Sequence, residues 1–249
     1  MPQFSDDLFL GAAETYMGVN TNSNLGDPAP MDLGVGPVGR IYVWDAVPLT
    51  KNAANIAAAS AYSSAITLTA GTGVTSVIRA DGVTALQVDV PRALSVTIGA
   101  GTITNRNVTI TGYDYYGQAM SEVIATGTTQ STTVNGKKAF YQITAATVSG
   151  AVGATISIGT TDIFGCPVRF SNKGYLARVG WDNTLAEDAA TVVVADATTA
   201  TTTTGDVRGT VVPSSAADGS KRLVVAVLLT AIQCGPNSTR AGALGVTQA

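Results

Sequence analysis

Histidine is absent from all 249 residues of the chain. Its absence excludes Ser-His-Asp and Cys-His nucleophile pairs, histidine-containing zinc sites and histidine acid–base catalysis. The chain has two cysteines, Cys166 and Cys234, too few for a four-cysteine zinc site or a disulfide framework. We expect two free thiols, although pairing between the two remains open. No Walker A motif or strand–GxGxxG–helix pattern occurs. The sequence therefore predicts no catalytic site, no cofactor and no metal.

Charge is also scarce. Charged residues make up 12% of the chain, against about 25% in an average soluble domain. The net charge is −3, and the basic doublets Lys137-Lys138 and Lys221-Arg222 are isolated, so we expect no nucleic-acid binding. A surface this poor in charge fits either a threonine-rich β protein or a subunit whose surface is covered by neighbours.

Long apolar runs are missing as well. The longest, residues 223–232, is well short of the roughly 20 residues of a membrane span, so we expect no membrane partner. The first residues, MPQFSDDLFLG, lack a cationic start and a long apolar core, which predicts no secretory signal.

What the chain does contain is alternation of apolar with small polar residues. Between residues 86 and 165, apolar side chains recur at every second position, which is typical of strands with one buried face. Gly, Pro and Asn punctuate these runs as turns would. We predict an all-β protein of sandwich or barrel type with an extended N-terminal arm. The arm spans residues 1–40, a β domain spans 41–165, and residues 166–249 form a second β domain or completing strands plus a C-terminal tail.

A hairpin around Gly117 is the clearest single element. Asp114 and Gly117 occupy the first and last positions of a type I turn, in which glycine readily adopts a positive φ. The implied register pairs Val108 with Ile124 and places Ile110 and Met120 on the same face. Glu122 falls on that face too, so either it lies at the rim of the sheet or the register is wrong by one residue.

Two other segments have distinctive patterns. Residues 51–62 are alanine-rich and predict either a short helix capped by Thr50 or an irregular loop, because Asn52 and Asn55 weaken a helix. Residues 222–232 form the strongest apolar run and predict a central strand.

Carboxylate pairs are the remaining enzymatic option, as in glycoside hydrolysis. The candidates are Asp114 with Glu122, and Glu187 with Asp188. Aromatic side chains that could stack on sugars are sparse, and Asp114 already forms the turn. We therefore predict that the protein is not an enzyme.

Interface residues are the better candidates for function. Exposed tyrosines are favoured anchors of protein interfaces, although ordinary packing of the hairpin explains them equally well. The candidate interface residues are Tyr113, Tyr115 and Tyr116 in the hairpin and the apolar anchors Leu8, Phe9, Leu10, Tyr16 and Met17 in the arm.

The sequence contains the stretches VDVPRALSVT, ITGYDYYGQAMSE, GKKAFYQITAATVSG, TDIFGCPVRFSNKGY and TTTTGDVRGTVVPSSAADGSKRLVV. These stretches resemble virion structural proteins of tailed, short-tailed bacteriophages, in particular head decoration (cement) proteins and minor capsid components. The resemblance covers most of residues 84–230 and consists of strands and turns, so no functional residue is transferred by it. It implies a β-rich, commonly trimeric protein that is made in the host cytoplasm, sits on the outer surface of the capsid, and clamps major capsid protein subunits together. The alternative is a tail-associated or receptor-binding adhesin that grips the host through the tyrosine-bearing loops.

Overall fold

The computed structural model describes residues 4–9, 37–182, 191–197, 199–230 and 246–248. Within these ranges the chain is nearly all β, and its helical content is one short 3-10 turn, η2 (Lys173–Tyr175). The all-β prediction is confirmed. No helix in the described part of the chain is long and apolar enough to cross a membrane.

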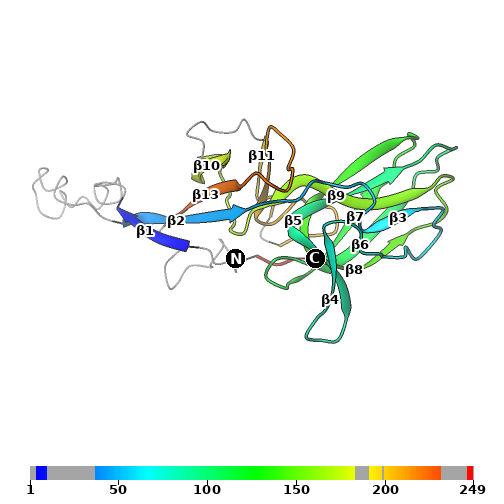
Figure 1. Cartoon of the computed structure of the whole chain (residues 1–249), viewed down its shortest axis with the longest axis horizontal. Coiled ribbons are helices and arrows are strands. Elements are labelled where there is room, and N and C mark those ends of the chain that lie inside the picture. The colour runs from blue at the N-terminus through cyan, green and yellow to red at the C-terminus, as the bar shows by residue number, and fades with distance from the viewer. Residues whose placement is uncertain (1–3, 10–36, 183–190, 198, 231–245, 249) are drawn as a thin grey trace, which may run out of the picture.

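The strands form two antiparallel sheets (Figure 1). The large sheet contains, in spatial order, β11 (Thr191–Val194), β12 (Gly209–Val212), β9 (Ile156–Gly165), β5 (Thr84–Ile98), β8 (Thr132–Val148), β6 (Asn107–Tyr113) and β7 (Ala119–Ala125). Two further strands join it, β3 (Ala57–Ser60) beside β9 and β4 (Val74–Ile78) beside β5. The small sheet contains β1 (Phe4–Phe9), β2 (Pro37–Ala46), β13 (Leu223–Thr230) and β10 (Leu176–Trp181).

The large sheet curls into a half-barrel, and irregularities in its long strands explain the curl. Between β5 and β8, Ala93 pairs with Ala139 but Ser95 pairs with Asn135, so residues 136–138 of β8 oppose Leu94 alone. Extra residues on one strand bend it and increase its twist.

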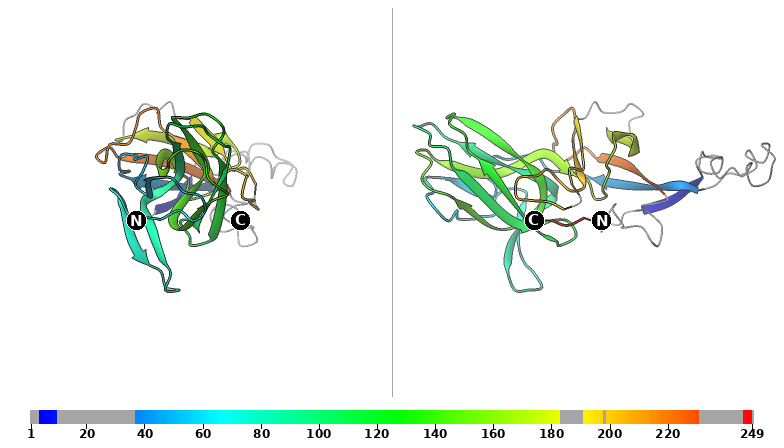
Figure 2. Two further views of the ribbon diagram at one scale, coloured as in Figure 1. Left: turned by 90° about the vertical axis from the view of Figure 1, so that its right-hand side faces the viewer. Right: turned by 180° about the vertical axis from the view of Figure 1, so that it is seen from behind.

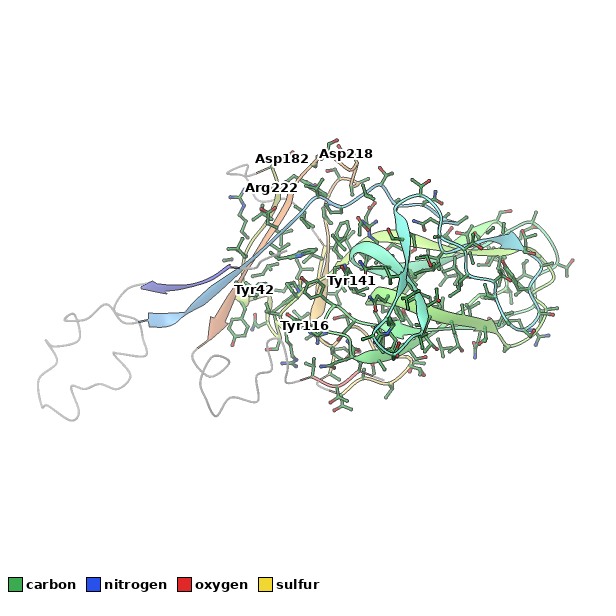
Figure 3. The ribbon with its side chains drawn as sticks, turned by 60° about the horizontal axis from the view of Figure 1, so that its bottom comes forward. Tyr42, Tyr116, Tyr141, Asp182, Asp218 and Arg222 are labelled. Carbon is green, nitrogen blue, oxygen red and sulfur yellow. The ribbon has the colours of Figure 1, made fainter. Side chains whose placement is uncertain are left out.

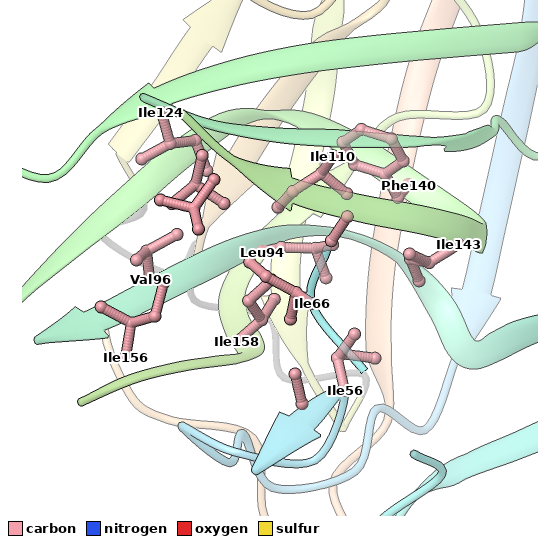
Figure 4. Close-up of a cluster of buried hydrophobic side chains, with 14 of the residues drawn as sticks. Ile56, Ile66, Leu94, Val96, Ile110, Ile124, Phe140, Ile143, Ile156 and Ile158 are labelled. Carbon is pink, nitrogen blue, oxygen red and sulfur yellow. The ribbon is translucent and has the colours of Figure 1, made fainter. Parts of the chain in front are cut away.

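The concave side of this sheet holds the main hydrophobic core (Figure 4). In β6 and β7 the buried and more exposed positions alternate, as the sequence pattern requires. Full burial of each Ile, Leu or Phe side chain contributes about 1.5–3 kcal/mol relative to exposure. The buried set includes Leu94, Val96, Ile98, Val108, Ile110, Ile124, Phe140, Ile143, Ile156 and Ile158.

A second core lies between the small sheet and the near ends of the large one. Both tryptophans of the chain, Trp44 on β2 and Trp181 on β10, are buried there. Val90 of β5 and Phe164 of β9 enter the same cluster from the large sheet. The two sheets therefore share a core at their junction. Tyr42 of the small sheet also lies near Tyr116, in the turn between β6 and β7 (Figure 3).

The molecule has two projecting parts. The paired strands β1 and β2 extend away from the half-barrel, and the β4–β5 hairpin points out to another side (Figures 1 and 2). A third, small buried cluster, apart from the two cores, consists of Ala200, Val207 and Val246.

Residues 51–62 do not form a helix. They contain turns followed by β3. The Asn52 Oδ1 accepts the N–H of Ala54, and the Asn55 side chain bonds to Thr72 and Thr160. Such side-chain bonds to nearby backbone compete with helix formation, so of the two predicted alternatives the helix is wrong.

Three further predictions concern residues 222–232, the part of the chain after residue 165, and the N-terminal arm. The predicted strand over residues 222–232 is β13, which lies between β2 and β10 within the small sheet. Strands that follow residue 165 enter both sheets, β10 and β13 the small one and β11 and β12 the large one. In the predicted arm, residues 4–9 form β1 and pair with β2, which itself begins at Pro37. The remainder of the arm lies outside the described residues.

Candidate functional site

The β6–β7 hairpin has the predicted turn and register. Val108 pairs with Ile124 and Ile110 with Glu122, and the N–H of Asp114 donates to the Gln118 carbonyl at 3.0 Å. Gly117 has a φ of +77°, a conformation that costs glycine little. The predicted register is confirmed.

The three hairpin tyrosines all contact other parts of the chain. Tyr115 makes edge-on ring contacts with Tyr116 and Tyr141, both at 5.3 Å between centroids. The Tyr116 hydroxyl donates to the carbonyl of Pro167 at 2.6 Å. The Tyr113 ring lies under the guanidinium of Arg79, 3.3 Å from centroid to Cζ. Whether these tyrosines also bind a partner stays a prediction.

Tyr42 joins this group from the small sheet (Figure 3). Burial raises the pKa of Tyr42 well above its usual value, and the neighbouring Tyr116 and Tyr115 add to the rise. Burial likewise raises the pKa of Tyr116. A hydrogen bond links the Tyr42 and Tyr116 side chains. The tyrosines thus join the two sheets through neutral, hydrogen-bonded hydroxyls.

Asp114 has a second role besides the turn. Its Oδ1 accepts the N–H groups of Tyr116 and Gln118, and its Oδ2 accepts Arg208 Nη1 at 2.8 Å. Gln248, near the C-terminus, donates to the same Oδ2 at 3.3 Å. Asp114 and Arg208 are both buried. The ion pair fastens Arg208 onto the hairpin, and the hydrogen bond does the same for Gln248.

Of the two explanations offered by the sequence, the one-residue slip is wrong, because the register is as predicted. Glu122 is buried and belongs to β7, the edge strand of the large sheet. Its Oε1 accepts the N–H of Lys137 at 2.6 Å, and its Oε2 accepts that of Lys138 at 3.4 Å. These N–H groups belong to the bulge of β8, where the regular pairing with β5 is interrupted. A Cβ at Gly136 would lie 2.6 Å from Glu122 Oε2, so glycine leaves room for the carboxylate.

Asp206 is a second acidic side chain that accepts N–H groups at this bulge. Its Oδ2 accepts the N–H of Ala139 at 2.9 Å, and its Oδ1 accepts those of Arg208 and Gly209. Two acidic side chains therefore accept three consecutive N–H groups, two in the bulge and that of Ala139 beside it. Buried N–H groups would be costly to leave unpaired.

Burial governs the electrostatics of this region. It raises the pKa of Glu122 to about 7, against the lowering effect of the Lys137 and Lys138 N–H groups and the Lys138 charge. Burial also raises the pKa of Asp206 and lowers that of Lys138. Perturbed carboxyl groups of this kind can indicate a catalytic site, but here each oxygen is engaged by backbone N–H groups that hold the fold.

The other sites suggested by the sequence offer little chemistry. Cys166 is a free, buried thiol whose pKa is raised by burial, so it is a poor nucleophile. Cys234, Glu187 and Asp188 lie outside the described residues. Within the described ranges no group of three Cys, Asp or Glu side chains is placed to hold a metal ion.

The predicted arm residues are only partly placed. Leu8 and Phe9 belong to β1, whose register with β2 shifts between these two residues. Leu10, Tyr16 and Met17 lie outside the described part of the chain. The role of these arm residues in an interface stays a prediction.

The sequence reasoning missed an apolar tip on the β4–β5 hairpin. Ile78 is 79% exposed and Val83 is 44% exposed, on either side of the turn formed by residues 79–82. The signal was present, since two bulky apolar residues flank a polar turn with Asp81-Gly82, the kind of turn that faces solvent.

A groove lies beside β11, on the opposite side of the molecule from this hairpin (Figures 1 and 2). It has a volume of about 620 Å³, and β11, β12 and residues 136–137 of β8 form its walls. Val193, 52% exposed, stands in its wall. Asp196 and Asp206 line the same groove, so its walls carry acidic as well as apolar side chains.

Comparisons with protein-family models, with curated proteins and with solved structures gave no match for this chain.

Proposed function

We propose that the chain is a non-enzymatic virion structural protein, a capsid decoration (cement) protein of a tailed bacteriophage. In this role it binds the outer surface of the head and stabilises contacts between subunits of the major capsid protein. It acts as a homo-oligomer, expected to be a trimer, without cofactor, nucleic acid or membrane.

One observation carries this proposal: the described chain has projecting β elements, and three of its buried acidic side chains hold the fold. The β1–β2 pair and the β4–β5 hairpin both extend from a body with two cores (Figure 1). Asp114, Glu122 and Asp206 are all occupied by internal partners. A clamp needs rigid projections rather than a reactive group, and several weak contacts made at once give tight binding through effective concentration.

The first experiment is antibody labelling of intact phage particles under the electron microscope. Label spread over the head supports the cement function, whereas label confined to the tail contradicts it. If intact particles take no label, disrupted particles are probed next, and absence of the protein from those also contradicts the proposal.

The second experiment removes residues 1–36. The deletion stops at Gly36 because β2 begins at Pro37 and pairs along its length with β13. We expect the truncated protein to remain folded, by circular dichroism, and to lose binding to capsids that lack the protein. Full decoration by the truncated protein would contradict a role of the arm in binding.

The alternative, a tail-associated adhesin, depends on the hairpin tyrosines as host-binding groups. Tyr115 and Tyr116 make the internal contacts described above, so no contact in the structure favours this alternative. Its test is the replacement of both tyrosines by alanine, with host-cell binding as the readout.

A further inference from the structure

Lys138 is a fully buried lysine that forms no ion pair within the described part of the chain. Its Nζ donates to the carbonyl of Ser121 at 2.9 Å. Two acidic side chains, Glu122 and Asp206, are buried beside it. We propose that the side chains of Lys138 and Asp206 join in an intramolecular amide bond, with Glu122 as the group that moves the proton. This modification goes beyond the proposed function and does not depend on it.

The two carboxylates flank the Cα of Lys138. Glu122 Oε2 accepts the N–H of Lys138 itself, and Asp206 Oδ2 accepts the next N–H along the chain, that of Ala139 at 2.9 Å. Both nitrogens lie within about 2.5 Å of the Lys138 Cα, and an extended lysine side chain reaches roughly 6 Å from that atom. Asp206 is therefore within reach of the amine once the flexible lysine side chain turns away from the Ser121 carbonyl.

Asp206 is held as the electrophile. Its Oδ1 accepts two backbone N–H groups, that of Arg208 at 2.8 Å and that of Gly209 at 3.1 Å. Two donors on one oxygen stabilise the negative charge that develops there when the carboxyl carbon is attacked, as in an oxyanion hole. The same oxygen becomes the carbonyl oxygen of the amide and keeps both donors.

Burial favours the protonation states that the reaction needs. It lowers the pKa of Lys138, against the charges of Glu122 and Asp206, and so favours the neutral amine. It raises the pKa of Asp206, which favours the neutral acid. It also raises the pKa of Glu122 to about 7, which suits a group that accepts a proton and returns it near neutral pH.

The reaction needs no other reactant. The lone pair of the neutral Lys138 Nζ forms a bond to Asp206 Cγ, and Nζ gives one proton to the Glu122 carboxylate. Glu122 then passes that proton to Asp206 Oδ2, which already carries the proton of the acid, and the Cγ–Oδ2 bond breaks as water leaves. One amine and one carboxylic acid thus become one amide and one water, and Glu122 returns to its starting state. Two ionisable groups disappear from the interior, where charge is costly.

The amide connects the bulge of β8 to the segment that precedes β12. It closes the chain between residues 138 and 206 into a covalent loop, and a cross-link of this kind restricts the unfolded chain as a disulfide does. Parts of the large sheet that are distant in sequence are thereby held together without cysteine. In any variant that cannot form the amide, Asp206 stays ionisable.

Intact-mass spectrometry of the purified, denatured full-length chain tests the bond. We expect the wild-type mass to lie below that of the sequence by one water, and Lys138→Arg, which cannot form the amide, to keep the full mass. Lys137→Arg is the matched control, because Lys137 is the exposed neighbour, and we expect it to lose water as the wild type does. Glu122→Gln should link at least about tenfold more slowly, because a positioned base contributes this much or more. A wild type of full mass after incubation at neutral pH overturns the proposal, whether or not the variants fold, and unchanged linkage in Glu122→Gln overturns the role of Glu122.

A tryptic peptide map assigns the position of the bond. Mass alone does not decide, because an aspartate before a glycine also loses water when it cyclises, and Asp81 and Asp218 both precede glycine. We expect a branched pair of peptides in which Lys138 is bonded to Asp206, with no cleavage after residue 138. A water loss located at any other residue overturns the assignment. The purified chain is measured without capsids, so failure of the capsid-binding experiments above would leave these results unchanged.

Discussion

At the scale of single residues, the chain buries carboxylates where its strands are irregular. Glu122 and Asp206 accept the N–H groups of three consecutive residues at the β8 bulge, Lys137 and Lys138 within it and Ala139 beside it. The sequence pattern could identify Glu122 as an acidic residue on an apolar face. It could not reveal the N–H groups that donate to its carboxylate, because Lys137 and Lys138 lie on another strand. Alternation shows which face a residue occupies, not which distant backbone group reaches it.

The raised pKa of Glu122 predicts a stability that falls as the pH rises. In the folded state the Glu122 carboxyl group keeps its proton up to about pH 7, whereas in the unfolded chain it releases the proton near pH 4.5. The folded state therefore binds more protons between these two pH values. The contribution of Glu122 to the free energy of unfolding is therefore greatest below pH 4.5 and declines between about pH 4.5 and 7. The total decline over that window is about 3 kcal/mol.

The variant Glu122→Gln tests this directly by urea unfolding at pH 5 and pH 8. We expect the difference in unfolding free energy between the two pH values to become clearly smaller, with the remainder due to Asp206, whose pKa burial also raises. Asp218→Asn is the control, because the N–H groups of Lys221 and Ser220 lower the pKa of Asp218 and keep it ionised at both pH values. An unchanged pH dependence in Glu122→Gln would contradict the assignment.

At the scale of elements, strand positions were largely predictable and their deformations were not. The alternation in residues 107–125 determined β6, the turn, β7 and their register, since one-residue slips would expose the apolar face. The bulges of β5, β8 and β9 have no local signature, because they arise from contacts between segments far apart in the sequence. The exposed tip at Ile78 was missed for a related reason, since a strand pattern does not say whether its end projects from the sheet.

The close packing of residues 52–56 on β9 predicts that a larger side chain there lowers the stability of the fold. A Cβ at Gly159 would lie 1.9 Å from the carbonyl oxygen of Asn52, where residues 52–56 pack onto β9 through the bond from the Thr160 N–H to that oxygen. Gly159→Ala must push this backbone away, and we expect a loss of about 1–3 kcal/mol or more, as in other overpacked sites. Thermal unfolding measures the loss.

Gly174→Ala is the control for that measurement. A Cβ at Gly174 would meet only Asn172 Oδ1 at 3.4 Å, an ordinary contact, so its unfolding temperature should stay close to that of the wild type. Equal effects of the two substitutions would contradict the close packing of residues 52–56 on β9.

At the scale of the whole molecule, the two sheets are interlocked by the path of the chain. The segment before β3 leaves the small sheet and enters the large one, and the strands after residue 165 return to both. Arg92 holds the segment that runs from β2 to β3. Its guanidinium donates to the carbonyl of Leu49 and to Asp89 Oδ2, and the same Asp89 oxygen accepts the N–H of Leu49. Chain order alone left open whether residues 166–249 formed a separate domain, since pairing in antiparallel sheets does not follow from sequence order.

This interlocking predicts that both sheets unfold together. Trp44 and Trp181 are the two tryptophans of the chain and both lie in the core beside the small sheet, so their fluorescence reports that core. Far-UV circular dichroism reports mainly the large sheet, which holds most of the strands. We expect the two signals to give the same urea midpoint, as for one cooperative unit. Separate midpoints would show that the core shared by Val90, Phe164 and the small sheet is too weak to couple the sheets. A capsid clamp made of two independently unfolding parts would also transmit force poorly between its projections, so coincident transitions are what the proposed function requires.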